Sequence, residues 1–478
     1  MTDPATKEAP DVNTASPDTE WAGIFRRRRD RIRARTGGGL ILWPGHSLQP
    51  RNYAGNAYPF RQNSHFLYVT GLAEPDLFLL SLPEAGHDIL FGDEASLDDI
   101  VWTGPRPTLK EMAAAAGIDD VRPTKNLRGM LDGARKEGTP VHYLPPYQHS
   151  SVYALARLLD IPMEEVGGRA SSILMEQAAL ERSVKGEEEV AEIEEALGIT
   201  ARMHRAAMAA ARPGMRESEL AGLIQGIALA EDRAQAFDPI VTVRGEVLHN
   251  HSYRNVLAAG ELVLNDSGAE SPLGYASDIT RTFPVSGRFS PLQADLYRAV
   301  LRTQLGAIAM IRPGISYREV HLGACLVLAG ALRDLGLMKG DPAAAVEAGA
   351  HALFLPHGIG HMLGLDVHDM EDLGDIVGHG KAKRPGQFGL NYLRLSRPLE
   401  AGFVLTVEPG VYFIPALIER WRSEGLHREF LDYDRIAALV GFGGIRIEDD
   451  VLVTPEGARV LGPPIPKTVA EVEEACAR

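Results

Sequence analysis

The stretch Pro356-His357-Gly358-Ile359-Gly360-His361-Met362-Leu363-Gly364-Leu365-Asp366-Val367-His368-Asp369 places three histidines among three glycines. Glycine removes side-chain bulk and widens the choice of backbone conformation, so the imidazoles can approach a ligand closely instead of lying on a regular helix face. This pattern favours a ligand site. Packed or solvated histidines are the alternative, and a metal site therefore requires partners elsewhere in the chain.

Four acidic residues outside this stretch end strand-like segments. Asp266 shares a strand face with the apolar residues 262 and 264, and Asp278 follows after a glycine-containing turn, so the two aspartates can face each other across a hairpin. Glu408 and Glu448 end two later apolar runs in the same way. A carboxylate on the buried side of a strand needs a partner.

Four converging carboxylates would repel one another and raise their own pKa values, so the cluster is understandable around cations. Two divalent ions balance the four charges. Oxygen ligands with one imidazole and no thiolate favour Mn²⁺, with Zn²⁺, Co²⁺ or Fe²⁺ as alternatives. A pair of ions about 3.5 to 4 Å apart lowers the pKa of water and polarises a carbonyl, which is the chemistry of hydrolysis. Isolated surface acids are the alternative for any one of these residues.

Length and composition bound the class of protein. A chain of 478 residues predicts two or three domains. The net charge of -15 argues against binding to nucleic acid. Cys325 and Cys476 are the two cysteines, too few for a disulfide framework or a cysteine zinc site, which suits a reducing cytoplasm. The sequence shows neither a membrane-spanning apolar run nor a signal peptide, so we expect a cytoplasmic protein.

The composition and hydrophobic pattern along the chain predict a tail and two domains. Residues 1–19 have the composition of a disordered tail. Residues 20–182 alternate short apolar runs with helical stretches, as in an α/β domain, and a helical pattern from 187 to 212 opens a second domain over residues 183–478. A second helix begins at Ser290 with a capping box to Gln293. Both helices end in Arg-Pro-Gly, at 212–214 and 312–314, which indicates an internal duplication.

An arginine-rich run follows the tail. Arg26 to Arg29, with Arg31, Arg33 and Arg35, could form a basic patch. Phe25 and Ile32 are spaced to anchor an amphipathic helix on an apolar surface. The pattern therefore favours a helix whose arginines form a solvated face.

These motifs resemble the proline-specific metallopeptidases of the pita-bread fold, aminopeptidase P and prolidase. Residues from about 183 to 463 resemble the catalytic domain of that family, and the segments Tyr58–Ser64, Thr70–Pro75 and the one around Trp102 resemble its N-terminal domain. The resemblance implies an α/β (α+β) chain in which an N-terminal α/β domain precedes a pseudo-twofold pita-bread catalytic domain.

The resemblance also implies a role for each site residue. The metal ligands would be Asp266, Asp278, His361, Glu408 and Glu448, with Asp278 and Glu448 bridging two ions and Glu408 carrying a proton. His249, with His251 as a weaker candidate, would contact substrate, His368 would stabilise the tetrahedral intermediate, His357 would lie beside the proline pocket, and Arg446 would support the site electrostatically. Trp102 would close an active site, its own or that of a neighbour in a homodimer or homotetramer.

The expected function is hydrolysis of the Xaa-Pro bond at the N-terminus of peptides. A dipeptidase is the alternative, because Arg394, fourteen residues before Glu408, resembles the arginine with which some prolidases hold the free carboxylate of proline. A surface salt bridge is the other interpretation of Arg394. A remote alternative is a catalytically dead peptide-binding module. Peptides with proline at the second position are the expected partners, without nucleic acid or membrane.

Overall fold

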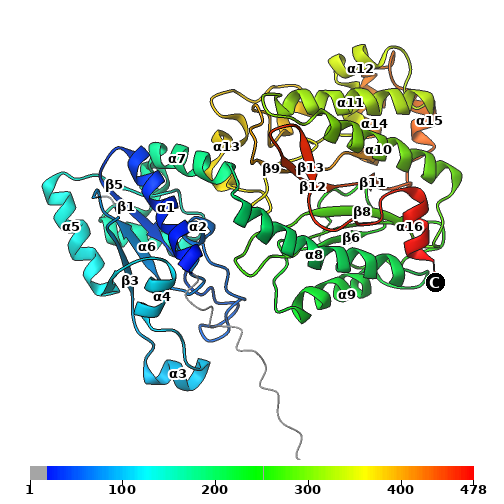
Figure 1. Cartoon of the computed structure of the whole chain (residues 1–478). Coiled ribbons are helices and arrows are strands. Elements are labelled where there is room, and N and C mark those ends of the chain that lie inside the picture. Colours follow the sequence, from blue (N-terminus) through cyan, green and yellow to red (C-terminus); the bar gives the residue numbers. More distant parts are fainter. Residues whose placement is uncertain (1–18, 85, 251, 478) are drawn as a thin grey trace, which may run out of the picture. The chain divides into compact units, whose positions relative to one another are not determined.

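The computed structural model describes residues 19–84, 86–250 and 252–477 (Figure 1). The chain divides into two units, Met1–Glu181 and Arg182–Arg478. The predicted disordered tail lies outside the described residues up to residue 18, and residue 19 begins the first helix, α1 (Thr19–Thr36).

The first unit is built on a five-stranded sheet in the order β4-β3-β2-β1-β5. The central strands β1, β2 and β3 are antiparallel, and the edge strands β4 and β5 run parallel to β3 and β1. The strands are β1 (Leu40–Pro44), β2 (Phe78–Ser81), β3 (Asp88–Gly92), β4 (Asp120–Pro123) and β5 (Val141–His142). Their inward side chains bury a core with helices on the faces, which confirms the predicted α/β domain.

The helices of this unit are α1, α2 (Ser64–Thr70), α3 (Leu97–Thr103), α4 (Leu109–Ala115), η1 (Thr124–Asn126), α5 (Leu127–Glu137), α6 (His149–Leu159), η2 (Met163–Glu165), η3 (Gly167–Arg169) and α7 (Ser172–Ser183), which runs across the boundary. Helix α3 differs from the other α-helices of this unit because it buries none of its residues, as is also true of the short turns η1, η2 and η3.

Helix α1 corrects one expectation. Arg28 and Arg29 are buried, so the predicted solvated face of arginines is wrong on this side of the helix. The Arg29 guanidinium donates to Asp88 Oδ2 at 2.7 Å and to the Val69 carbonyl at 2.7 Å. Burial alone would raise the pKa of Asp88, but Arg29 and Arg33 lower it. The buried carboxylate of Asp88 is therefore stabilised by arginines of α1 that the sequence pattern had predicted to face solvent.

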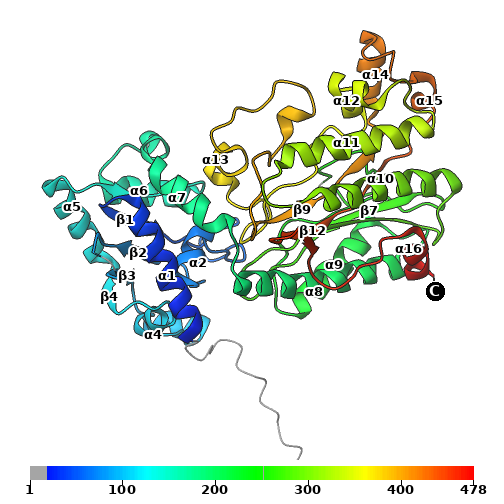
Figure 2. The ribbon, with the colours of Figure 1, turned by 45° about the horizontal axis from the view of Figure 1, so that its top comes forward.

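The second unit holds three small sheets between pairs of helices. One sheet orders β6-β7-β8, another β13-β12-β9, and β10 pairs with β11. Their strands are β6 (Ile240–Thr242), β7 (Leu262–Ser267), β8 (Ile279–Pro284), β9 (Val404–Val407), β10 (Gly410–Tyr412), β11 (Gly444–Arg446), β12 (Asp449–Val453) and β13 (Ala458–Val460). In Figures 1 and 2 these strands lie between the α8–α9 pair and the α10–α11 pair.

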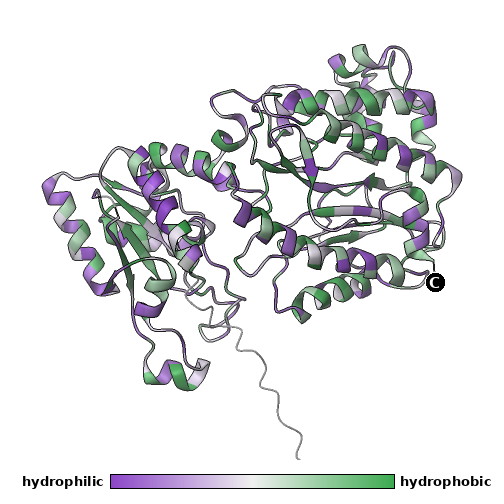
Figure 3. Ribbon diagram, viewed as in Figure 1, coloured by the Kyte–Doolittle hydropathy of each residue, from purple (hydrophilic) through white to green (hydrophobic). Residues whose placement is uncertain are grey.

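The long helices form two antiparallel pairs, α8 (Glu187–Ala210) with α9 (Glu217–Ala230) and α10 (Pro291–Met310) with α11 (Tyr317–Asp334). Shorter ones are α12 (Pro342–Ala348), η4 (Ala350–Leu353), η5 (Glu371–Leu373), α13 (Asp375–His379), η6 (Leu390–Tyr392), α14 (Pro415–Glu424), α15 (Tyr433–Ala437) and α16 (Val469–Cys476). The predicted cap of α10 is confirmed, since Ser290 and Gln293 form a capping box. Figure 3 shows the strands as mostly hydrophobic.

The two helix pairs repeat one local structure. Gly214 and Gly314 both have a φ of +89°, and their N–H groups donate to the carbonyls of Leu257 and Leu399 at 2.9 and 2.8 Å. Each repeat continues into a β-bridge, Arg216 to Val256 in the first and Ser316 to Pro398 in the second. A left-handed residue at this turn explains the glycine in each Arg-Pro-Gly motif. The predicted duplication is therefore present in the fold.

In the part of the chain that the structure describes, none of the helices combines the length and the apolar character needed to cross a bilayer.

Candidate metal centre

A cavity of about 860 Å³ in the second unit gathers ten of the predicted site residues. Its lining includes the five predicted ligands Asp266, Asp278, His361, Glu408 and Glu448, together with His249, His357, His368, Arg394 and Arg446. Trp102 belongs to the first unit, where it lies on α3 with 85% of its surface exposed. His251 lies outside the described residues.

Strand ends deliver the four carboxylates. Asp266 lies in β7 and Asp278 directly precedes β8, while Glu408 directly follows β9 and Glu448 lies between β11 and β12. The backbone at these positions is fixed by further bonds, since the Glu408 N–H donates to the Ile359 carbonyl at 2.8 Å. Two sheets and the histidine-rich stretch therefore hold one cluster.

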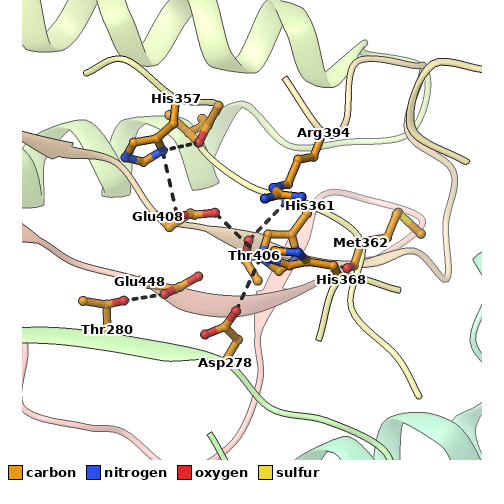
Figure 4. A network of polar contacts seen from close by, with 12 residues as sticks. Asp278, Thr280, His357, His361, Met362, His368, Arg394, Thr406, Glu408 and Glu448 are labelled. Atoms are coloured by element: carbon orange, nitrogen blue, oxygen red, sulfur yellow. Dashed lines mark hydrogen bonds and ion pairs between the residues drawn. The ribbon is translucent and has the colours of Figure 1, made fainter. Parts of the chain in front are cut away.

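His361 is oriented to offer one nitrogen to this cluster (Figure 4). Its Nδ1 lies 3.0 Å from the Met362 carbonyl and donates to it, so Nε2 is the nitrogen that faces the carboxylates. Nε2 lies 3.4 Å from Asp278 Oδ2 and 3.7 Å from Glu408 Oε1. Potential ligand atoms of Asp278, His361 and Glu448 all lie within 4.8 Å of one another. A backbone carbonyl that fixes the tautomer in this way is typical of metal-binding histidines.

The electrostatics of the cluster fit a cation. Burial and the neighbouring carboxylates raise the pKa of Asp278 and that of Glu448 well above their usual values, and burial raises the pKa of Glu408. Among the described residues, Asp266 Oδ1 and Asp278 Oδ1 are buried without a hydrogen-bond partner. Oxygen atoms that crowd together without donors are what a hard metal ion needs as ligands.

Arg446 connects the carboxylates to a histidine. Its Nη2 donates to Asp266 Oδ2 at 2.5 Å, its Nε to Thr280 Oγ1 at 3.0 Å and its Nη1 to the Tyr412 hydroxyl at 3.0 Å. The Tyr412 hydroxyl lies 2.9 Å from Nε2 of His357. Tyr412 and Thr280 were not predicted, because neither stands out from the strand in which it occurs.

His368 belongs to a second chain of charges. Its Nδ1 lies 3.3 Å from Glu371 Oε2, and Arg394 forms an ion pair with the same carboxylate. Burial would raise the pKa of Glu371, but the hydrogen bonds from His368 and Arg394 lower it to about 2. Burial lowers the pKa of His368 to about 4, so the ring is neutral at pH 7. Glu371 was not predicted as a site residue. Its position three residues after His368 was the sequence pattern that could have indicated this contact.

The segment that carries His249 is held in place by hydrogen bonds to Glu217. This buried carboxylate accepts from the Thr242 hydroxyl and the Val243 N–H, both at 2.9 Å, and from the N–H of Asn255 at 3.1 Å. The two ends of the segment that bears His249 are thereby tied to the first turn of α9. Sequence patterns gave no sign of this role, since Glu217 looks like an ordinary acidic residue in a first helical turn.

Asp369, the last residue of the histidine-rich stretch, is a buried anion. Lys185 Nζ donates to it at 2.9 Å and Arg182 Nη2 at 2.6 Å. Burial alone would raise the pKa of Asp369, but Lys185 and Arg182 lower it. The end of the stretch is therefore fixed by the first residues of the second unit.

Comparison with known families decides the class. The family model for metallopeptidase family M24 matches residues 191–455, more than half of the chain, and the model for the aminopeptidase P N-terminal domain matches residues 25–142. The chain belongs to metallopeptidase family M24. The fold and the predicted family are thereby confirmed.

Named M24 relatives cover nearly the whole chain. A probable Xaa-Pro aminopeptidase of Fusarium vanettenii is 32% identical over 420 residues, which is 87% of this chain and 87% of the relative. The aminopeptidase PepP of Pseudomonas aeruginosa has a TM-score of 0.77 at 29% identity, covering 95% of this chain and 98% of that one. A zinc-substituted aminopeptidase P of Escherichia coli in complex with product has a TM-score of 0.75 at 29% identity, with coverage of 95% and 98%.

Family membership and the carboxylate cluster together support a metal requirement. The ligand set fits the metal on its own chemistry, because the buried oxygens have raised pKa values and two of them lack donors.

Removal of the metal is expected to change the pH dependence of stability. In the metal-free protein the folded cluster holds protons that the unfolded chain releases near pH 4, so the free energy of unfolding should fall as pH rises above about 4, by about 1.4 kcal/mol per pH unit for each proton held. Metal-loaded protein should not show this fall, since its carboxylate ligands are already deprotonated in the folded state. Urea unfolding between pH 5 and 8, with and without chelator, measures both.

Asp278→Asn is the control, because it removes one carboxyl from the cluster and should flatten the metal-free curve. A metal-free curve that is level from pH 5 to 8 contradicts the raised pKa values.

Proposed function

We propose that the chain is a two-metal exopeptidase that hydrolyses the Xaa-Pro bond at the N-terminus of peptides and uses Mn²⁺. The observation that carries the proposal is the cluster of Asp266, Asp278, Glu408, Glu448 and His361 in the lining of the cavity. Four carboxylates balance two divalent charges, and oxygen-rich sites suit Mn²⁺. Relatives that cover most of the chain are named Xaa-Pro aminopeptidases.

A bond before proline poses a particular problem. Its nitrogen is a tertiary amide without N–H, and φ of the ring is fixed, so a peptidase that grips an extended N–H-donating backbone handles it poorly. Recognition must use the shape of the ring and the free amino terminus. When bound, the two ions lower the pKa of water and polarise the scissile carbonyl.

Glu408 is placed to move the proton that the leaving nitrogen needs. Its Oε1 lies 3.7 Å from His361 Nε2 and its Oε2 lies 3.9 Å from His357 Nδ1. Because burial raises the pKa of Glu408, the carboxyl group can carry a proton nearer to neutral pH than an exposed glutamate. We assign it the role of general acid to the proline nitrogen.

Two of the histidines around the cluster, His357 and His249, act as neutral groups. Burial lowers the pKa of His357 to about 3, and its Nδ1 donates to the Gly358 carbonyl at 2.7 Å, so the Tyr412 hydroxyl donates to Nε2. His357 therefore presents a fixed ring face, suitable for contact with proline. Burial and Arg446 lower the pKa of His249, which leaves it neutral for substrate contact near the solvent.

His368 serves the developing oxyanion in this proposal. Its Nδ1–H points to Glu371, so Nε2 has to take up a proton before it can donate to the oxyanion. The negative charge of Glu371 favours that second proton as negative charge builds on the substrate.

The cavity extends well beyond the cluster. Its lining also includes Phe388, Tyr392, Leu417 and Arg420, none of which belongs to the carboxylate cluster. A cavity of about 860 Å³ has more room than a dipeptide fills, so we infer that residues after proline also bind in it and that longer peptides are accepted. Arg394 also lines the cavity, which is the observation that favours the dipeptidase alternative. In this structure, however, its guanidinium pairs with Glu371.

Two substrates test the function. Mn²⁺-loaded protein should hydrolyse a Xaa-Pro-Xaa-Xaa tetrapeptide at least as fast as a Xaa-Pro dipeptide, measured by release of the first residue. Glu408→Gln should lower kcat by about 100-fold or more, the size of a general acid contribution. Hydrolysis of the dipeptide alone identifies a dipeptidase, and hydrolysis of neither by metal-loaded protein identifies a binding module.

Arg394→Ala separates the two roles of this arginine. Its positive charge lowers the pKa of His368, so its loss should favour the protonated ring and shift the alkaline limb of the tetrapeptide pH profile to higher pH, while KM stays within about twofold. Arg422→Ala is the matched control, because Arg422 pairs with Asp434 and is not among the residues that line the cavity, and it should leave the profile unchanged. A rise of about tenfold or more in KM for the dipeptide would instead show capture of its carboxylate.

We propose further that the protein assembles through α3 as a homodimer or homotetramer. Leu97, Val101 and Trp102 expose their apolar side chains on this helix, and such patches mark interaction surfaces. Trp102→Ala should lower the mass measured by sedimentation, whereas an unchanged mass excludes α3 as the interface.

Both cysteines are free thiols, and this supports a cytoplasmic location.

A further inference from the structure

A second cluster of metal-ligating side chains lies in the interior of the second unit, apart from the carboxylates. His321 and Cys325 are one turn apart on α11 and so share one face of the helix. His351 faces them from η4, with its ring centroid 6.4 Å from that of His321. All three side chains are fully buried, and one potential ligand atom from each lies within 4.8 Å of the other two.

The polar atoms of this cluster are unsatisfied. Both ring nitrogens of His351 and Nδ1 of His321 have no hydrogen-bond partner among the described residues. The contact between Cys325 Sγ and His321 Nε2, at 3.5 Å, is the interaction that the cluster makes within itself. A buried polar group without a partner costs about 1 to 3 kcal/mol. At most one nitrogen of each ring can face a shared point, and two buried imidazoles with unpartnered nitrogens beside a thiol indicate a missing ligand.

We propose that His321, Cys325 and His351 form a second metal site that binds one monovalent, thiophilic cation of the Cu⁺ type. Two imidazoles and a sulfur are soft or borderline ligands, in contrast to the oxygen ligands of the catalytic cluster. Three protein ligands complete a trigonal shell. A buried Zn²⁺ site would need a fourth ligand, and among the described residues no fourth His, Cys, Asp or Glu joins these three fully buried side chains within 4.8 Å.

Charge also selects a monovalent ion. Cu⁺ and a thiolate sum to zero, so the loaded site places no net charge in the apolar interior, whereas Zn²⁺ and a thiolate would leave one uncompensated positive charge. Binding forms a bond from the Cys325 sulfur to Cu⁺ and releases the thiol proton to solvent, with no change in oxidation state. Burial lowers the pKa of His321 to about 3 and that of His351 to about 4, so both rings keep a lone pair for the ion.

The distance between the ligands is suitable. Bonds of about 2.3 Å to sulfur and 2.0 Å to nitrogen, arranged in a plane around the ion, place sulfur and nitrogen about 3.7 Å apart. The observed separation of Cys325 Sγ and His321 Nε2 is 3.5 Å. A change of side-chain rotamers therefore suffices for binding, without a shift of α11.

Copper binding by the full-length, Mn²⁺-loaded protein tests the site. Cu⁺ supplied without oxygen from a competing chelator should bind at one ion per chain. X-ray absorption at the copper edge should show one sulfur and two imidazole nitrogens. That shell distinguishes this site from the catalytic cluster, which has no sulfur.

Substitutions identify which cysteine supplies the sulfur ligand. Cys325→Ser should weaken Cu⁺ binding by about 100-fold or more, and His351→Gln should act in the same direction. Cys476→Ser is the matched control, because it removes the other buried thiol and should leave binding unchanged. Peptide hydrolysis by each variant reports that it has folded.

Several results would overturn the proposal. These are no uptake by the wild-type protein, a copper shell without sulfur, binding that survives in a folded Cys325→Ser variant, or displacement of Cu⁺ by an equal concentration of Zn²⁺.

Discussion

Repulsion between buried carboxylates constrains the second unit more than any other interaction. Asp266, Asp278, Glu408 and Glu448 come from opposite halves of the repeat, and each would be easier to accommodate alone than beside the others. Only one protein cation, Arg446, contacts the cluster directly among the residues described, through Asp266. The remaining charge has to be met by protons or metal ions. The β-strands, the histidine-rich stretch and the helices around them hold the carboxylates together against this repulsion.

The sequence predicted those parts of the fold and site that depend on local patterns. Each of these patterns involves only a few neighbouring residues. They are the acidic residues at the ends of apolar strands, the cap of α10 at Ser290 and the repeated Arg-Pro-Gly turns. Family resemblance then supplied the roles. The cavity contains all of the predicted site residues that the structure describes except Trp102, which belongs to the other unit.

What the sequence could not predict depends on partners that are distant in the chain. Arg29 meets Asp88 across 59 positions, and no period along α1 marks that side as buried. Tyr412 meets Arg446 and His357, and Glu217 meets Asn255, through contacts that only the folded chain defines. Buried polar partners are specified by tertiary structure, and a tyrosine in a strand or a glutamate in a first helical turn looks ordinary until its partner is known.

The ion pairs of Asp369 determine where the chain can be divided. The family match to the catalytic half begins at residue 191, which invites a shortened protein that starts there. Such a protein would lack Arg182 and Lys185 and would leave the Asp369 carboxylate buried without either of its cations, one residue beyond His368. The catalytic half therefore extends into the last turn of α7. A protein shortened to the limits of sequence similarity would lose the two cations that stabilise Asp369 beside the active site.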